Sequence, residues 1–307
     1  MIAAITGANG FIGRHLVDRF NAAGWQVRPV FRSHYESKNL ARLFSEADVV
    51  VHAAGATRAP THDQLHASNV GLTATTLDAS SQGRVGRFVY VSSQAAAGPA
   101  AFRGAAVSED NPAAPVEAYG RTKLQAEELV RSAAGLPSVI VRPGAVYGPY
   151  DRDFLPLHRL AARGVAIHAG NRKQWISIIH VTDLVDGIFL AATATRAIGR
   201  TFFLANAEPV QWDVLFRNVA SCAGRTLGVD VEIPAPIVDL GSALGDVVAR
   251  LTGHAGLLTT EKVALSKSPF WICSSARARA ELGFTTPTNL HHGLCATYHW
   301  YVENGWL

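Results

Sequence analysis

Tyr119 and Lys123 are the pair whose residue types and spacing best suit proton transfer. A spacing of four places both side chains on one face of a helix, one turn apart, and the pattern of Ala126, Leu129 and Val130 continues that helix. A neighbouring ammonium favours the phenolate, so we expect Lys123 to lower the Tyr119 pKa from its usual value of about 10. The pair would then exchange protons near neutral pH.

A second group of residues, near the amino terminus, is typical of a dinucleotide site. The glycines of segment 7–13 directly follow an apolar strand predicted over residues 2–6, and a helical pattern begins at once. Glycines in this context permit a tight turn, close approach of the backbone to a pyrophosphate, and close packing of helix on strand. The helix would present free N–H groups and its positive dipole end to the phosphates. The predicted contacts are Gly7, Asn9, Gly10, Phe11, Ile12 and Gly13.

The elements that must position these residues alternate between strands and helices. Short apolar runs predict strands, and longer amphipathic segments separate most of them. This alternation predicts an α/β fold with a doubly wound, Rossmann-type parallel sheet that helices cover on both faces. The predicted strands are Ile2–Thr6, Gln26–Phe31, Asp48–His52, Arg87–Ser92, Ser138–Arg142 and Thr201–Leu204.

The domain organisation follows from where the alternation weakens, at about Tyr150. We expect residues 1–150 to form a dinucleotide-binding domain, with strand and helix returns near 174–206. Residues 151–307 are expected to form a smaller, mostly helical and discontinuous substrate-binding part. Between Arg32 and Asp48 there is room for one helix, about Lys38 to Ser45, because a crossover takes at least ~10 residues. The third strand of the usual scheme is therefore expected to be missing or vestigial.

Several segments together resemble the extended short-chain dehydrogenase/reductase superfamily, often labelled NAD-dependent epimerase/dehydratase. The resemblance spans nearly the whole chain and rests on GxxGxxG (7–13), DVVVHAAG (48–55), NVG (69–71), YxxxK (119–123), RPGAVYG (142–148), HVTD (180–183) and the carboxyl-terminal segment 300–307. It implies reversible hydride transfer between a nicotinamide and a secondary alcohol or ketone. In that chemistry Tyr119 would be the acid/base, and Lys123 would also bond the nicotinamide ribose.

The resemblance implies further site residues. Ser93, at the end of the strand before the Tyr119 helix, would hold the substrate oxygen, and Ser92 is the less favoured alternative. Asn69 would either support a chain of waters in the active site or bond to backbone. The remaining implied cofactor contacts are His52, Ala53, Ala54, Gly55, Asn69, Val91, Pro143, Gly144 and Val146.

The choice of dinucleotide depends on the end of the second strand. An acidic residue there serves the ribose hydroxyl in NAD enzymes, whereas an arginine serves the extra phosphate of NADP. Here the strand ends Val30-Phe31-Arg32 without a carboxylate, and a guanidinium fork suits a dianionic phosphate. We therefore favour NADP(H) over NAD(H) as cofactor, while Glu36 is the residue that would serve NAD(H).

The resemblance also narrows the reaction. Dehydratases of the superfamily carry Asp and Glu where this chain has Gln94 and Ala95, which argues against dehydration. Epimerases often carry Arg where this chain has Ile176, which weakens the case for a nucleotide sugar unless Arg172 or Lys173 substitutes. The segments 233–251 and 271–284 look like those of dihydroflavonol reductases and 3-beta-hydroxysteroid dehydrogenases, although an apolar helical face is also typical of core. The candidate substrate contacts are Gln94, Tyr147, Arg172 and Trp175.

Three functions therefore stay open. The first is a reductase or dehydrogenase acting on a small-molecule ketone or alcohol, the second a nucleotide-sugar epimerase that retains its cofactor, and the third a non-catalytic dinucleotide sensor. The presence of Tyr119 and Lys123 argues against the sensor, and fold analogy alone does not choose between the other two. Relatives are often dimers, which leaves a homodimer as one arrangement for this chain.

Composition bears on the other classes of protein. A hydrophobic fraction of 48% argues against disorder, and the net charge of +4 is spread without a basic run, so we expect no nucleic-acid partner. No segment approaches the ~20 apolar residues of a membrane span, and no signal peptide is evident. Cys222, Cys273 and Cys295 are odd in number and form no CxxC pair. We expect free thiols in a reducing, cytoplasmic setting and no metal site.

Overall fold

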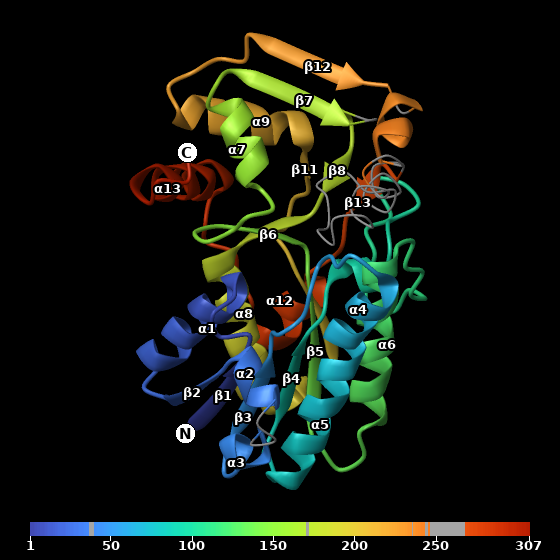
Figure 1. The fold of residues 1–307 in the computed structure, drawn as a ribbon, viewed down its shortest axis with the longest axis vertical. Helices are drawn as coiled ribbons and strands as arrows, with labels where there is room; N and C mark the ends of the chain where they lie inside the picture. Colours follow the sequence, from blue (N-terminus) through green and yellow to red (C-terminus); the bar gives the residue numbers. More distant parts are fainter. Residues whose placement is uncertain (37–39, 170–171, 235, 243–244, 246–267) are drawn as a thin grey trace.

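A six-stranded parallel sheet forms the centre of the larger part of the molecule (Figure 1). The structure is a computed structural model that describes the chain except for residues 37–39, 170–171, 235, 243–244 and 246–267. The strand order is β10-β5-β4-β3-β1-β2, and all neighbouring strands run parallel. The strands are β1 (Ile2–Thr6), β2 (Gln26–Val30), β3 (Val49–His52), β4 (Phe88–Val91), β5 (Ser138–Pro143) and β10 (Thr201–Leu204).

Helices cover both faces of this sheet. Because successive strand residues face opposite sides, Ile5 and Val51 belong to the apolar core on one face, whereas Ala4 and Val50 belong to the core on the other. The first face is covered by α1 (Phe11–Ala22), α8 (Val181–Thr193) and α12 (Ala276–Leu282), and the second by α3 (Leu40–Phe44), α5 (Leu72–Gln82) and α6 (Ala118–Ser132). The predicted doubly wound α/β fold is confirmed.

The sheet ends at β2, and among the described residues no third strand of the usual scheme lies beyond it. After β2 the chain forms α2 (Arg32–Glu36) and α3 before it pairs as β3 on the other side of β1. The missing strand is as predicted. The sequence predicts a single helix in this connection, whereas the structure has two, α2 and α3. Helix α2 was not predicted because its sequence, Arg-Ser-His-Tyr-Glu, shows no hydrophobic periodicity.

The rest of the chain forms a smaller part beyond the carboxyl ends of the strands (Figure 1). Its short strands pair as β7 (Val165–Ala169) with β12 (Val229–Ile233), β6 (Ala145–Tyr147) with β9 (Ile178–His180), and β8 (Trp175–Ile176) with both β11 (Val210–Gln211) and β13 (Phe270–Trp271). Its helices are α7 (Leu155–Ala161), α9 (Trp212–Cys222) and α13 (Leu290–Glu303). This part mixes strands with helices, where the sequence predicts mostly helices. Part of the apolar stretch 233–251, namely residues 235, 243–244 and 246–251, lies outside the described residues.

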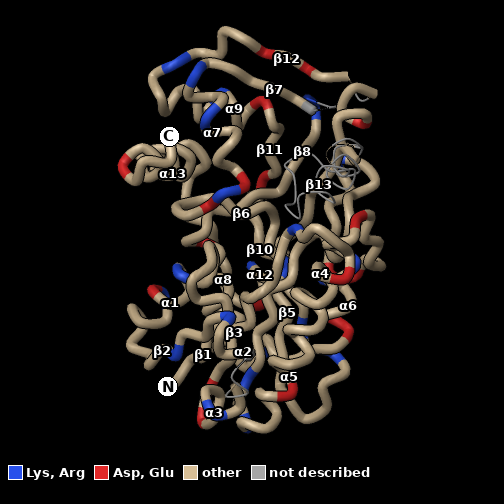
Figure 2. Tube along the Cα trace, in the orientation of Figure 1, with Lys and Arg blue, Asp and Glu red and all other residues tan. Residues whose placement is uncertain are grey.

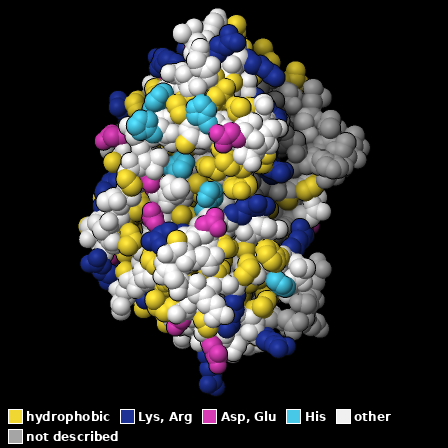
Figure 3. All heavy atoms as spheres, turned by 90° about the vertical axis from the view of Figure 1, so that its left-hand side faces the viewer, with side chains coloured by type: hydrophobic (Ala, Val, Ile, Leu, Met, Phe, Trp, Pro, Cys, Tyr) yellow, Lys and Arg dark blue, Asp and Glu magenta, His cyan; other side chains and the backbone are white. Residues whose placement is uncertain are grey.

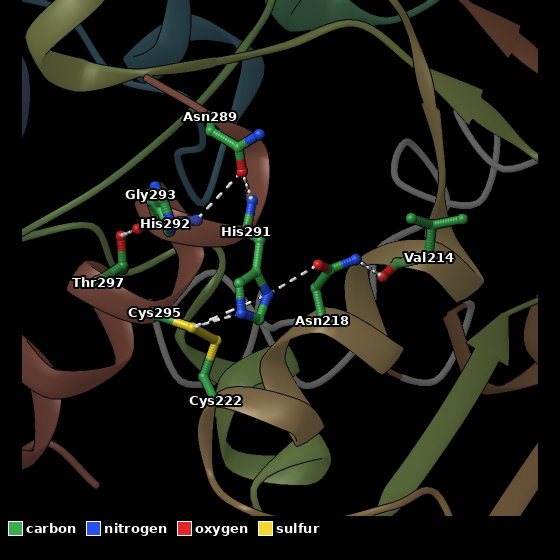
Figure 4. The surroundings of a disulfide bond; sticks show 9 residues. All are labelled: Val214, Asn218, Cys222, Asn289, His291, His292, Gly293, Cys295 and Thr297. Atoms are coloured by element: carbon green, nitrogen blue, oxygen red, sulfur yellow. Dashed lines mark hydrogen bonds between the residues drawn. A yellow bond between two sulfur atoms is a disulfide. The ribbon is translucent and has the colours of Figure 1, made fainter. Parts of the chain in front are cut away.

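A disulfide between Cys222 and Cys295 joins α9 to α13 (Figure 4). The prediction of free thiols is therefore wrong for these two cysteines and holds for Cys273, which is buried. The pairing was not evident because the two cysteines are 73 residues apart, and only the packing of α9 against α13 brings them together. Because two of the three cysteines form a disulfide, the cysteines no longer support a reducing compartment.

Charged residues are scattered along the chain in both parts of the molecule, with Lys and Arg interspersed among Asp and Glu (Figure 2). Among the described residues, none of the helices combines the length and the apolar character of a membrane span.

Candidate active site

The glycine turn after β1 has the geometry of a cradle for phosphates. Gly7 has a φ of +68°, a region that favours glycine, and a Cβ on Gly13 would lie 1.9 Å from the Gly7 carbonyl oxygen. Helix α1 starts directly after Gly10, and no side chain caps its first N–H groups. These groups and the helix dipole therefore point into open space, which suits a pyrophosphate.

A cavity of about 410 Å³ opens above this turn. The predicted residues that line it are Gly7, Asn9, Gly10, Arg32, Ala53, Ala54 and Gly55. Phe11, Ile12 and Val146 instead pack against the apolar core beneath. Sequence reasoning missed five further lining residues, namely Tyr35, Ala56, Ala67, Ser68 and Leu72. The side chain of Glu36 lies outside the described part of the chain.

Two predicted cofactor contacts, His52 and Asn69, have partners that make them supports of this cavity. The buried His52 ring bonds to the hydroxyls of Thr6 (2.7 Å) and Thr73 (3.1 Å), and burial lowers its pKa to about 3, so the imidazole is neutral. The Asn69 side chain bonds both the N–H and the carbonyl of Ala56 and donates to Thr122. The sequence leaves two roles open for Asn69, support of a water chain or bonds to the backbone, and the structure shows bonds to the backbone of Ala56.

Lys123 lies beneath the rim of the cavity. The residue is 5% exposed, its ammonium donates to the Val91 carbonyl at 2.8 Å, and a Cβ placed on Gly55 would lie 3.6 Å from its Nζ. Burial lowers the Lys123 pKa to about 8, against an opposing effect of the Glu127 carboxylate. The Val91 carbonyl thus orients the lysine.

Tyr119 lies one turn before Lys123 on α6 and hydrogen-bonds to Ser93. Burial raises the Tyr119 pKa to about 12, although the bond to Ser93 acts in the opposite direction. This differs from the predicted lowering by Lys123, because the cost of burying a phenolate outweighs the favourable contacts. The phenol is consequently a proton donor at neutral pH.

A buried ionic cluster behind the site distinguishes Ser92 from Ser93. The Ser92 hydroxyl donates to Glu127 at 2.6 Å, and the same carboxylate receives two bonds from Arg142 and one from Arg131. The Ser92 hydroxyl is therefore occupied by its bond to Glu127, and Ser93 is the serine whose hydroxyl is left for the substrate oxygen beside Tyr119. Sequence reasoning missed Glu127, although its position one turn after Lys123 on the same helix was a usable signal.

A second cavity, of about 210 Å³, lies on the Ser93 side of this pair. Ser93 and Gln94 line it, and so do Pro143 and Gly144, which are predicted from the sequence as cofactor contacts. The residues that sequence reasoning did not place there are Ala95, Glu117, Ala145, Gln174, Ile176, Trp212 and Trp271. The Gln94 amide nitrogen is buried and has no hydrogen-bond partner among the described residues.

The other three candidate substrate contacts lie elsewhere. Tyr147 is fully buried in the core of the smaller part, with its ring against His180. Arg172 forms an ion pair with Asp230 of β12. Trp175 stacks beneath the guanidinium of Arg103. None of the three lines either cavity among the described residues.

Comparison with known proteins agrees with this fold and site. Residues 3–205 match the model of the NAD dependent epimerase/dehydratase family. A ceramide reductase of Caulobacter vibrioides is 30% identical over 332 residues, which cover 100% of this chain and 96% of the relative. A 4-hydroxy-2-methyl-3-oxo-4-farnesyl-3,4-dihydroquinoline-1-oxide ketoreductase of Stigmatella aurantiaca is 28% identical, with coverage of 95% and 94%.

A solved structure of MoeE5 in complex with UDP-glucuronic acid and NAD shares the fold, with a TM-score of 0.79 and 23% identity over 99% of this chain and 100% of that one. The fold and the site thus define an enzyme of the Rossmann type that works with a nicotinamide dinucleotide. The chain belongs to the NAD dependent epimerase/dehydratase family.

Proposed function

We propose that the chain reduces an apolar ketone with NADPH, with Tyr119 as proton donor, Ser93 as holder of the ketone oxygen and Lys123 as the group that bonds the nicotinamide ribose. One observation carries the proposal: the Tyr119–Lys123 pair lies between two cavities. Lys123 lies beneath Gly55 of the larger cavity, and Tyr119 bonds to Ser93 of the smaller one. We assign the larger cavity, within residues 1–150, to the dinucleotide, and the smaller one, which residues from 151–307 complete, to the substrate.

The proposed reaction balances with groups that the chain supplies. A reduced nicotinamide, held at the glycine turn and Lys123, would supply the hydride for the carbonyl carbon. Ser93 donates a hydrogen bond to the carbonyl oxygen and holds it beside Tyr119, which gives that oxygen its proton. The products are an alcohol and the oxidised dinucleotide, and the phenolate regains a proton from solvent. The raised Tyr119 pKa supports this direction, because it keeps the phenol protonated before the transfer.

The lining of the smaller cavity supports an apolar substrate. Ile176, Trp212 and Trp271 contribute aliphatic and aromatic surface, and Gln94 contributes an amide N–H that has no partner in the described part of the chain. Arg172, one of the two residues that could serve a nucleotide diphosphate, is paired with Asp230 outside the cavity. Two relatives are named as reductases, of ceramide and of a farnesyl-substituted quinoline oxide. The second candidate function is a nucleotide-sugar epimerase, which is favoured by 27% identity over 282 residues to a UDP-glucose 4-epimerase of Vibrio cholerae.

Net consumption of NADPH separates the two candidates. A reductase uses one NADPH for each ketone, whereas an epimerase returns its hydride and shows no net turnover. We expect ketone-dependent loss of NADPH absorbance with apolar steroid or long-chain 3-oxo compounds, and no change with UDP-glucose. Interconversion of UDP-sugars without loss of NADPH would refute the proposal.

The choice of NADP(H) can be tested at Arg32, an exposed residue that lines the dinucleotide cavity. Arg32→Ala is expected to weaken NADPH binding roughly tenfold or more, because a hydrogen bond to a charged group contributes about 1.5–3 kcal/mol. NADH binding should stay unchanged, since NADH lacks the extra phosphate. Fluorescence titration measures both affinities, and Arg42→Ala, at an exposed position on α3, is the control. Equal losses for the two dinucleotides would contradict the assignment.

The Lys123 pKa predicts how turnover depends on pH. Burial brings this pKa down to about 8, so the ammonium form, which the proposed ribose contact requires, is lost as the pH rises through that value. We expect kcat/KM for NADPH, which reports the free enzyme, to fall above pH 8. In Lys123→Arg the side chain stays charged, so whatever activity remains should show no such decline. A wild-type profile that stays flat to high pH would argue against this role.

A further inference from the structure

Cys222, Cys295 and His291 bring three metal-ligating side chains together at the contact between α9 and α13 (Figure 4). One ligand atom from each lies within 4.8 Å of the others. The two cysteines are half-buried and His291 is exposed, so the group is accessible from solvent. Figure 3 shows histidine side chains on the face of the molecule that lies at the left of Figure 1. His291, His292 and His299 occupy exposed positions of α13.

The spacing of His291 and Cys295 already fits a tetrahedral ion. They are four residues apart on α13, and the His291 Nε2 lies 3.6 Å from the Cys295 Sγ. Bonds of ≈ 2.3 Å to sulfur and 2.0–2.1 Å to nitrogen at a tetrahedral Zn²⁺ place these two atoms about 3.6 Å apart. The same geometry needs the two sulfurs about 3.8 Å apart, so the ion and the disulfide exclude each other.

A hydrogen-bonded support orients the histidine for this role. The Asn218 side chain donates its Nδ2 to the Val214 carbonyl at 2.8 Å, which fixes its Oδ1 as the acceptor that faces His291. The His291 Nδ1–H therefore donates to this oxygen, at 3.1 Å, and the lone pair of Nε2 is left on the side of the sulfurs. Metal-bound histidines are typically held in this way, by a bond from the other ring nitrogen.

We propose that the reduced chain binds one thiophilic divalent cation, with Zn²⁺ as the reference ion, through the Cys222 and Cys295 thiolates and the His291 Nε2. Water completes the fourth position. A dithiol reductant supplies the two electrons and two protons that convert the disulfide to two thiols, and becomes a disulfide itself. The cation then displaces the two thiol protons as it binds. Such a site differs from the sequence-based expectation of no metal, because Cys222 joins the two ligands of α13 only through the packing of α9 on that helix.

The test uses Co²⁺, whose thiolate bonds give a charge-transfer band in the near ultraviolet, with the full-length chain reduced and kept anaerobic. We expect one equivalent to bind with this band, Zn²⁺ to displace it, and the oxidised chain to show no band. Cys222→Ser should abolish the band, and Cys273→Ala should leave it unchanged. Asn218→Ala is expected to weaken Co²⁺ binding roughly 10–100-fold.

His291→Ala and His292→Ala form the matched pair that tests the third ligand. The first should weaken Co²⁺ binding by more than Asn218→Ala does, and the second should match the wild type, because His292 lies outside the cluster. Circular dichroism checks that each variant is folded. If a cysteine variant does not fold, the oxidised wild type, in which Cys222 and Cys295 form a disulfide and offer no thiolates, replaces it as the control. Absence of the band in the reduced wild type would overturn the site. Equal affinities in the two histidine variants would do the same.

Discussion

Tyr119→Phe is expected to lower turnover by roughly 10²–10⁴-fold, the range that a positioned proton donor contributes. The ring stays in place and the hydroxyl is lost, so the ketone oxygen has no donor when the hydride arrives. Dinucleotide affinity should change little, because Tyr119 does not line the dinucleotide cavity. The measurement is a rate assay combined with fluorescence titration of NADPH.

Tyr150→Phe is the matched control for this variant, since Tyr150 is a partly exposed phenol that lines neither cavity. Its turnover should equal that of the wild type. If Tyr119→Phe retained full activity, another group would have to deliver the proton and the proposed mechanism would be wrong.

Glu127→Ala is expected to reduce the free energy of unfolding by about 3–5 kcal/mol, the typical cost of breaking a buried ion pair. Glu127 is fully buried, and its carboxylate receives two bonds from the guanidinium of Arg142, itself 4% exposed. Removal of the carboxylate leaves the arginine charge buried without a partner. Urea denaturation followed by circular dichroism measures the loss.

Two comparisons make the Glu127 result specific. Glu128→Ala, at the exposed neighbouring position, should change stability by no more than about 0.5 kcal/mol. The double variant Glu127→Leu with Arg142→Met should recover much of the loss, because apolar replacement of both partners is often tolerated. A loss in Glu127→Ala no larger than that in Glu128→Ala would show that the pair does not stabilise the fold.

The same carboxylate predicts how stability responds to acid. The bonds from Arg142 hold the Glu127 pKa below its usual value of 4.5, against the opposing effect of burial. The stabilisation is therefore fully present above pH 4.5 and is lost as the pH falls through the lowered value.

Local sequence patterns were sufficient for the sheet and for the glycine cradle. The predicted β1 and β10 match the structure residue for residue, because buried parallel strands are continuous apolar runs. The cradle was predictable because Gly7 and Gly13 meet conformational demands that arise within one strand–turn–helix unit. The missing strand followed from chain length alone.

Properties that depend on tertiary packing were not predictable in this way. Trp212 and Trp271 line one cavity but lie on elements far apart in the sequence, and no local pattern links them. The Tyr119 pKa is set mainly by burial, which the spacing to Lys123 does not reveal. The bond between Cys222 and Cys295 likewise exists only because two distant helices pack together.

A crystal structure of the chain with NADPH tests the central claim most directly. We predict the pyrophosphate on the turn of Gly7 and Gly10, the ribose of the nicotinamide at Lys123, and the nicotinamide ring between Tyr119 and the cavity that Ser93 lines. A dinucleotide bound elsewhere, or one whose nicotinamide points away from the Tyr119 hydroxyl, would contradict the account.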